Sequence, residues 1–209
     1  KETTPEGVTY AYPLNTTGMV TSLTYVEDPV GNRHTLSYAS GLLQTLQDAV
    51  GRKVTFGYDA NNLLQTIQDW AGRVTTLAYD TTLAAGKPLL TTLTGPTGCQ
   101  TVYQYSLTYA DNTPLLRGIL DPNGQGTSYT YDNAMRMQKR TVQGVGTWTY
   151  LYQPGQTFVV DPLNQTVTAT VDSHWAPTAE TNALGQVTTY TRNPNLQETA
   201  RMNPLGQVA

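Results

Sequence analysis

The chain has 209 residues, of which only 13% are charged, and a formal net charge of -3, which excludes a polycation built to hold a nucleic-acid backbone. Its densest basic group, Arg136, Lys139 and Arg140, is typical of a solvated strand face. The first residues lack a secretory signal pattern, and no apolar run approaches the roughly 18 residues of a membrane span. Cys99 is the single cysteine, so no intrachain disulfide can form.

Threonine and tyrosine are abundant, with 14 tyrosines in the chain. β-branched and aromatic side chains fit a pleated, half-buried surface, so this composition favours strands. No segment combines helix caps with an apolar stripe of 3.6-residue period. The composition and the patterning therefore predict an all-β chain.

One short turn motif recurs along the chain, at intervals of 20 to 26 residues apart from a single interval of 40. Asp or Asn opens the turn because its side chain accepts a hydrogen bond from the backbone two residues on, and Gly or Asn closes it in left-handed geometry. The interval of 40 is two units, the second supplied by the aromatic stretch Thr147–Tyr152. The turns are Asp28-Pro-Val-Gly31, Asp48-Ala-Val-Gly51, Asp69-Trp-Ala-Gly72, Gly95-Pro-Thr-Gly98, Asp121-Pro-Asn-Gly124, Asp161-Pro-Leu-Asn164, Asn182-Ala-Leu-Gly185 and Asn203-Pro-Leu-Gly206.

A stretch with period two follows each turn, as in Val54, Phe56 and Tyr58, which predicts a strand with one packed face. These strands often end in Asp or Asn, where a second turn such as 59–62 reverses the chain. The unit is therefore a β-hairpin of about twenty residues, and a lone hairpin is only marginally stable, so units must pair edge to edge. One residue of each unit should then form an apolar row across the sheet: Phe56, Leu77, Tyr103, Tyr129, Tyr150 and Tyr190.

Two segments, 81–90 and 107–116, read as lengthened hairpin loops. The repeats are clearest from residue 28 onward. We expect residues 1–209, with about eight hairpin units, to be a fragment of a longer array.

The repeated turn, followed by a strand that ends in Tyr-Asp, resembles the YD repeat of the RHS family. The clearest matches are 127–132, 56–59 and 77–80. The resemblance implies hairpins that wind as a continuous spiralling sheet into a hollow shell. In bacterial polymorphic toxins and insecticidal toxin complexes such a shell encloses a toxic C-terminal region, and in teneurins a related shell belongs to a cell-surface adhesion protein.

Two positions depart from the family pattern, because Val171 and Arg192 stand where the last tyrosine of the strand is expected. The core that ends an RHS shell and carries self-cleaving aspartates is not recognisable, so no catalytic role transfers to this chain. The resemblance implies secretion or a cell-surface location.

Several residues are of types that can carry chemistry. The turn aspartates Asp28, Asp48, Asp69, Asp121 and Asp161 each offer one carboxylate, whereas calcium needs six to eight oxygens, so turn capping is favoured. His34, His174 and Cys99 have no partners at ligand or catalytic spacing. We therefore expect no catalytic, cofactor or metal site.

Trp70 and Trp175 are the exception, because exposed indoles can stack on sugars or clasp a partner protein. The sequence thus predicts a non-enzymatic shell segment that encloses a polypeptide and contacts the rest of its own array. The alternative is an extracellular adhesion module that binds glycan or a cell-surface protein. Nucleic-acid binding and membrane insertion are not expected, and an enzyme lacks a visible catalytic constellation.

Overall fold

The computed structural model describes residues 1–13, 21–84, 86–107 and 113–208. Its described residues form nineteen strands and no helix, which confirms the predicted all-β fold. The strands belong to one antiparallel sheet in which consecutive strands pair. The chain divides into two compact units, Lys1–Val102 and Tyr103–Ala209.

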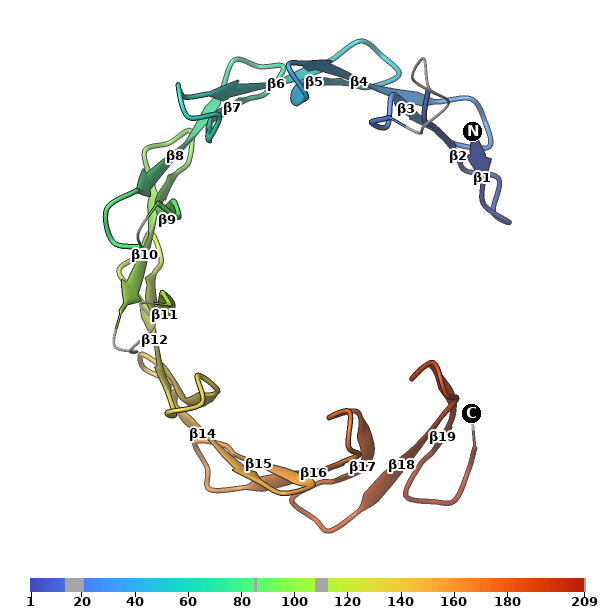
Figure 1. The fold of residues 1–209 in the computed structure, drawn as a ribbon, viewed down its shortest axis with the longest axis vertical. Helices are drawn as coiled ribbons and strands as arrows, with labels where there is room; N and C mark the ends of the chain where they lie inside the picture. Colours follow the sequence, from blue (N-terminus) through green and yellow to red (C-terminus); the bar gives the residue numbers. More distant parts are fainter. Residues whose placement is uncertain (14–20, 85, 108–112, 209) are drawn as a thin grey trace. The chain divides into compact units, whose positions relative to one another are not determined.

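In the first unit, strands that are consecutive in the sequence lie side by side (Figure 1). The strands of this unit are β1 (Glu2–Thr3), β2 (Thr9–Ala11), β3 (Tyr25–Glu27), β4 (Arg33–Ala39), β5 (Leu42–Gln47), β6 (Lys53–Tyr58), β7 (Leu64–Gln68), β8 (Val74–Asp80), β9 (Leu89–Thr94) and the start of β10 (Gln100–Ser106).

The second unit continues from the end of β10 with the same alternation of strand and turn. Its strands are β11 (Leu115–Leu120), β12 (Gly126–Tyr131), β13 (Met137–Val142), β14 (Gly146–Gln153), β15 (Gln156–Val160), β16 (Thr166–Val171), β17 (Pro177–Thr181), β18 (Val187–Arg192) and β19 (Glu198–Met202). The expected aromatic strand at 147–152 is therefore β14.

The sheet has almost no core of its own. Among the described residues only Ala11 and Ala84 are buried apolar residues, at 5% and 3% exposure, and no polar residue is buried. Each unit is therefore a single layer of strands, held by backbone pairing and by contacts between side chains of neighbouring strands.

The predicted turns have the expected geometry. Gly72, for example, has a φ of 77°, and Asn164, which replaces glycine, has a φ of 61°. In the first turn of each hairpin the third residue beyond the opening Asp or Asn donates its N–H back to that residue's carbonyl, as Gly72 does to Asp69 at 3.0 Å. This turn is a local structure that its own five residues specify.

The second turn of the hairpin is the same five-residue turn, which the sequence only partly revealed. Asp59 N donates to Leu63 O at 2.9 Å and Asn62 N to Asp59 O at 3.1 Å. The left-handed position of this turn is held by Asn62, Met135, Trp175 and Leu196, with φ between 61° and 64°. Three of these side chains are large and apolar, and such side chains rarely adopt positive φ.

The expected row of one apolar residue per unit is interrupted by residues of the return strands. The residue directly opposite each member comes from the intervening return strand: Ile67 lies opposite Phe56, Leu93 opposite Leu77, Arg140 opposite Tyr129, Val159 opposite Tyr150 and Arg201 opposite Tyr190. The row does not run straight across the sheet, because Ile67 in turn lies opposite Thr75 and Arg140 opposite Trp148, each two residues before the expected Leu77 and Tyr150. The prediction of one aligned row was therefore wrong in register.

A β-bulge precedes the terminal tyrosine in both units. The register shifts between Gly57 and Tyr58 in β6, so that Gln65 of β7 is the extra residue. The same shift occurs at 37/38, 78/79, 130/131, 170/171 and 191/192. Where the extra residue is threonine it binds the facing carbonyl, as Thr178 Oγ1 does to Thr170 O at 3.1 Å. Bulges increase local twist and re-aim the next side chain.

The two lengthened loops lie partly outside the described residues. Residues 85 and 108–112 are not described. In the first loop Asp80 Oδ1 accepts hydrogen bonds from Thr82 N and Leu83 N at 2.7 and 3.0 Å, and β9 begins at Leu89, earlier than the sequence indicated.

Candidate functional site

The turn carboxylates are used as backbone acceptors. Asp69 Oδ1 accepts hydrogen bonds from Ala71 N at 2.9 Å and Arg73 N at 3.0 Å. The same pair of bonds forms at Asp28, Asp48, Asp59, Asp121, Asp132, Asp161, Asp172, Asn182, Asn193 and Asn203. Asparagine serves as well as aspartate because only one side-chain oxygen is needed.

No metal centre emerges from these carboxylates within the described ranges, where no group of three or more His, Cys, Asp or Glu side chains is placed to hold an ion. His34 lies on β4 opposite Val26. His174 lies in the 172–176 turn, where its Nδ1 is 3.5 Å from Ser173 Oγ. Cys99 is exposed in the turn before β10. The structure does not bring these three residues together.

The second oxygen of several turn carboxylates binds the fifth residue of the turn. Arg52 Nε is 2.5 Å from Asp48 Oδ2 and Arg73 Nε is 2.6 Å from Asp69 Oδ2. Arg136 makes the same contact with Asp132 at 2.9 Å from Nε, and Asn32 Nδ2 with Asp28 at 2.7 Å. Exposed pairs of this kind add little stability alone, but they fix where each guanidinium lies.

These guanidinium groups also lie against aromatic rings. The Arg52 guanidinium carbon is 4.9 Å from the centre of the Trp70 ring, and the Arg73 carbon is 6.0 Å from it. Arg136 lies 4.4 Å from the Tyr152 ring, and Arg140 lies 5.0 Å from the Trp148 ring. Cations are attracted to the faces of aromatic rings. Arg52 and Arg136 thereby join a turn to a neighbouring hairpin, whereas Arg73 and Trp70 share one turn and Arg140 lies on β13 opposite Trp148.

The tyrosine of the Tyr-Asp pair has a defined role. Its hydroxyl donates to the backbone carbonyl fifteen residues earlier: Tyr58 to Leu43 at 2.8 Å, Tyr79 to Leu64 at 2.9 Å, Tyr131 to Leu116 at 2.7 Å and Tyr152 to Met137 at 2.8 Å. Desolvation raises the pKa of Tyr79 and of Tyr152, so both hydroxyls keep their protons and donate. The contact links each hairpin to the one before it.

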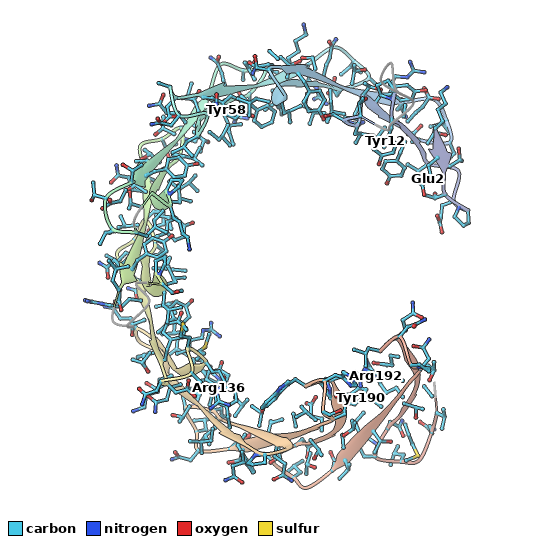
Figure 2. The ribbon with its side chains drawn as sticks, viewed as in Figure 1. Glu2, Tyr12, Tyr58, Arg136, Tyr190 and Arg192 are labelled. Carbon is cyan, nitrogen blue, oxygen red and sulfur yellow. The ribbon has the colours of Figure 1, made fainter. Side chains whose placement is uncertain are left out.

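The two departures from the tyrosine pattern behave differently. Arg192 preserves the contact, since its guanidinium donates to the carbonyl of Pro177, fifteen residues earlier. Val171 has no such donor, and only its backbone N–H bonds, to Gly155 O at 2.9 Å. Figure 2 shows Tyr58 on the inner side of the curved sheet of the first unit, and Arg136, Tyr190 and Arg192 on the inner side of the second.

We expect Arg192→Met to lower the free energy of unfolding by about 1 kcal/mol, because a hydrogen bond from a charged donor is lost. Arg192→Tyr should recover most of that loss, since tyrosine makes the same contact in four other hairpins. Urea titration of both variants measures the difference. Equal losses in the two variants would show that the carbonyl contact contributes nothing.

The two tryptophans that the sequence singled out are both exposed, Trp70 at 55% and Trp175 at 58%. Trp70 follows Asp69 in the turn between β7 and β8, and Arg52 and Arg73 lie against it. Trp175 stands at the left-handed position of the turn between β16 and β17. The positive φ of Trp175 had no signal in the sequence, whereas the fifteen-residue spacing of the tyrosine contact could have been found by aligning the repeats.

Nothing in the described part of the chain forms a helix long and apolar enough to cross a membrane. The hollows found among described residues are small and open, with volumes of about 170 to 360 Å³. The largest of these is lined partly by Trp148 and Asp161, and Arg140 already lies against Trp148.

Fold and turn chemistry together define a tandem β-hairpin repeat protein. Its sequence matches the family described as RHS Repeat over residues 38–74, which run from the end of β4 to the first residue of β8. Over these residues the chain carries RHS repeats, as its Tyr-Asp units indicated. A search of curated proteins gave no match.

Two solved structures share the fold. One is described as the crystal structure of TcdB2-TccC3, with a TM-score of 0.56, 14% identity and 95% of this chain covered. The other is TcdB2-TccC3-Cdc42, with a TM-score of 0.54, 14% identity and 98% of this chain covered. This chain spans 12% and 13% of the length of those chains.

Proposed function

We propose that this chain is a non-enzymatic wall segment of an RHS-type shell that encloses and protects a polypeptide, foremost a C-terminal toxin domain. The observation that carries the proposal is the single layer of hairpins, in which turn carboxylates, tyrosine hydroxyls and arginines serve to join one hairpin to the next. A closed set of backbone hydrogen bonds separates two volumes of solvent without needing a core.

The proposal extends to partners and location. The first partner is the rest of the same repeat array, of which residues 1–209 supply about eight units. The small share of the two similar structures that this chain spans, 12% and 13%, supports this part of the proposal. The likeness in fold to structures whose descriptions name TcdB2-TccC3 supports a toxin shell. A protein of this kind acts outside the cell or at its surface.

Protease protection of the full-length protein tests enclosure. We expect the enclosed polypeptide to be digested at least tenfold more slowly within the intact protein than when it is expressed alone, because the wall bars the protease. The cleavage sites are mapped over time by mass spectrometry. Equal rates in the two preparations would contradict enclosure.

The second candidate is an adhesion module that binds glycan or a cell-surface protein, and the exposure of Trp70 and Trp175 favours it. Under this reading Trp70→Ala or Trp175→Ala abolishes binding to a glycan array without unfolding the protein. Under the shell reading both substitutions leave protease protection unchanged.

A further inference from the structure

The turn between β16 and β17, residues 172–176, holds a carboxylate with one oxygen unused. Asp172 Oδ1 accepts hydrogen bonds from His174 N at 2.8 Å and Ala176 N at 3.0 Å. Its Oδ2 has no hydrogen bond or ion pair with any residue that the structure describes. Backbone hydrogen bonds, foremost from Ala176, lower the pKa of Asp172, so the group is ionised near neutral pH.

Three other turns of this chain fill the corresponding place with arginine, whereas the turns of Asp59, Asp121 and Asp161 have Leu63, Gln125 and Gln165 there. Arg73 and Arg136 stand at the fifth position of their turns, where each binds the Oδ2 of its own aspartate and lies against an aromatic ring. Arg52 does the same between Asp48 and Trp70. A guanidinium held by one carboxylate and one ring is therefore a recurring feature of the array.

The 172–176 turn has the ring and the carboxylate but not the arginine. Ala176 occupies the fifth position, and no described Lys or Arg lies over the Trp175 ring. A hollow of about 170 Å³ lies beside the indole. The hollow is lined by Pro154, Gly155, Val171, Asp172, Ser173 and Trp175.

Two features keep this place open. Val171 stands where other hairpins carry a tyrosine ring, so the wall of the hollow is a short aliphatic side chain. Trp175 has a φ of 62°, which is costly for a large side chain and presents the indole to solvent at 58% exposure. Asn62, Met135 and Leu196 have the same φ in the corresponding turns, so what distinguishes this turn is the exposed indole beside the hollow.

The charges of His174 and Arg192 both lower the pKa of Asp172. His174 belongs to the same turn and donates its backbone N–H to Oδ1, whereas Arg192 is the nearby cation from another strand. It contributes to the lowered pKa of Asp172, but its guanidinium is committed to the carbonyl of Pro177 and forms no ion pair with Asp172. Arg192 belongs to β18 and does not line the hollow, whereas Pro154 and Gly155 of the turn between β14 and β15 do. A second cation can therefore reach the carboxylate through the hollow.

We propose that the 172–176 turn binds a cationic side chain of a polypeptide, an arginine or a lysine, between the Trp175 ring and the free oxygen of Asp172. The site takes from a partner the group that Arg73 and Arg136 supply within their own turns. An indole face and a carboxylate together select a cation over a neutral side chain of the same shape.

The tryptophan indole N–H signals of the labelled chain report on binding, with Trp70→Phe and Trp148→Phe used to assign them. The probes are N-acetyl-arginine methylamide and its neutral counterpart, N-acetyl-citrulline methylamide. We expect the Trp175 signal to shift saturably with the arginine probe, at a Kd on the order of millimolar. Citrulline should bind at least tenfold more weakly.

Three substitutions separate this site from a general surface effect. Asp172→Asn removes the charge but keeps the turn, as Asn182, Asn193 and Asn203 show, and should weaken arginine binding at least tenfold. Trp175→Asn places at the left-handed position the residue that Asn62 already supports, and should abolish binding. Ala176→Arg should fill the site from within and exclude the probe.

Leu196→Asn, at the same position of the 193–197 turn, is the matched control and should leave the affinity unchanged. Equal binding of arginine and citrulline, or unchanged affinity in Asp172→Asn or Ala176→Arg, would overturn the proposal. A Trp175 shift with glucose but not with arginine would also overturn it and assign the hollow to sugar. The comparison of arginine with citrulline needs only the unaltered chain, so it decides the matter even if a variant fails to fold.

Discussion

Gly146→Ala should be the most damaging small substitution in the sheet, with a loss of about 2 to 4 kcal/mol of unfolding free energy. Gly146 has a φ of 138°, and an added Cβ would lie 2.5 Å from Cβ and 2.9 Å from Cγ of Pro162. The proline ring is rigid and belongs to a turn whose ends are fixed by Asp161, so neither side of the contact can yield cheaply. Urea titration followed by circular dichroism measures the loss.

Substitutions of two other turn glycines distinguish backbone strain from a steric collision with Pro162. Gly185→Ala keeps a positive φ of 77° but meets no atom within 4 Å, so it should cost only about 1 kcal/mol. Gly72→Val, at a φ of 77°, should cost about 1 kcal/mol or more because valine is β-branched. His34→Ala removes an exposed side chain and should change stability by less than about 0.5 kcal/mol. A Gly146→Ala variant no less stable than Gly185→Ala would contradict the collision with Pro162.

The first turn of each hairpin was predictable because its geometry depends on its own residues. Asp69 Oδ1 accepts hydrogen bonds from the backbone of residues 71 and 73, and Gly72 supplies the left-handed end. The five residues 69–73 are therefore enough to predict the turn. The strand that follows alternates visibly, and the repeat period then places strand after strand. The all-β architecture thus follows from local chemistry repeated in phase.

Contacts between strands, within and between hairpins, were not predictable in the same way. The bulge before Tyr58 depends on how β6 pairs with β7, and no single stretch of sequence encodes that pairing. Arg192 read as a break in the tyrosine pattern, yet it reaches the same carbonyl position that tyrosine reaches elsewhere. The collision site at Gly146 is equally hidden, because Pro162 lies in a different turn.

The candidate binding site could be predicted from the sequence only in part. Exposure of Trp175 was expected from its surroundings in the sequence, but the unused oxygen of Asp172 becomes visible only when its turn is compared with those of Asp69 and Asp132. At the fifth position of its turn the sequence has Ala176, where the other two turns have arginine. The importance of this difference is visible only in the structure, where Arg73 and Arg136 each contact both a carboxylate and an aromatic ring.

Acid should destabilise the protein through the turn carboxylates acting together. The pKa of Asp28 is lowered from 3.8 by the side chain of Asn32, that of Asp132 by the side chain of Arg136, and that of Asp172 by the backbone of Ala176. At Asp48 and Asp69 desolvation raises the pKa, but hydrogen bonds from Arg52 and Arg73 outweigh it and the net shift is downward.

The sign of the effect follows from these shifts. Because the folded-state pKa lies below the unfolded value, the unfolded chain binds protons first as pH falls. The contribution of each carboxylate is complete above about pH 4 and is lost as pH falls through its lower folded-state pKa. We therefore expect the urea midpoint to be level between pH 7 and 5 and to fall steeply between pH 4 and 2.

Matched substitutions test whether the turns cause this fall. Combined replacement of Asp28, Asp132 and Asp172 by asparagine keeps the hydrogen bonds to the turn backbone and should flatten the dependence below pH 4. Asn182→Asp does the reverse, because it introduces a titrating group into a turn that asparagine already forms, and should steepen it. Urea midpoints at pH 5, 4, 3 and 2 that change in parallel for all three proteins would show that acid acts elsewhere in the sheet.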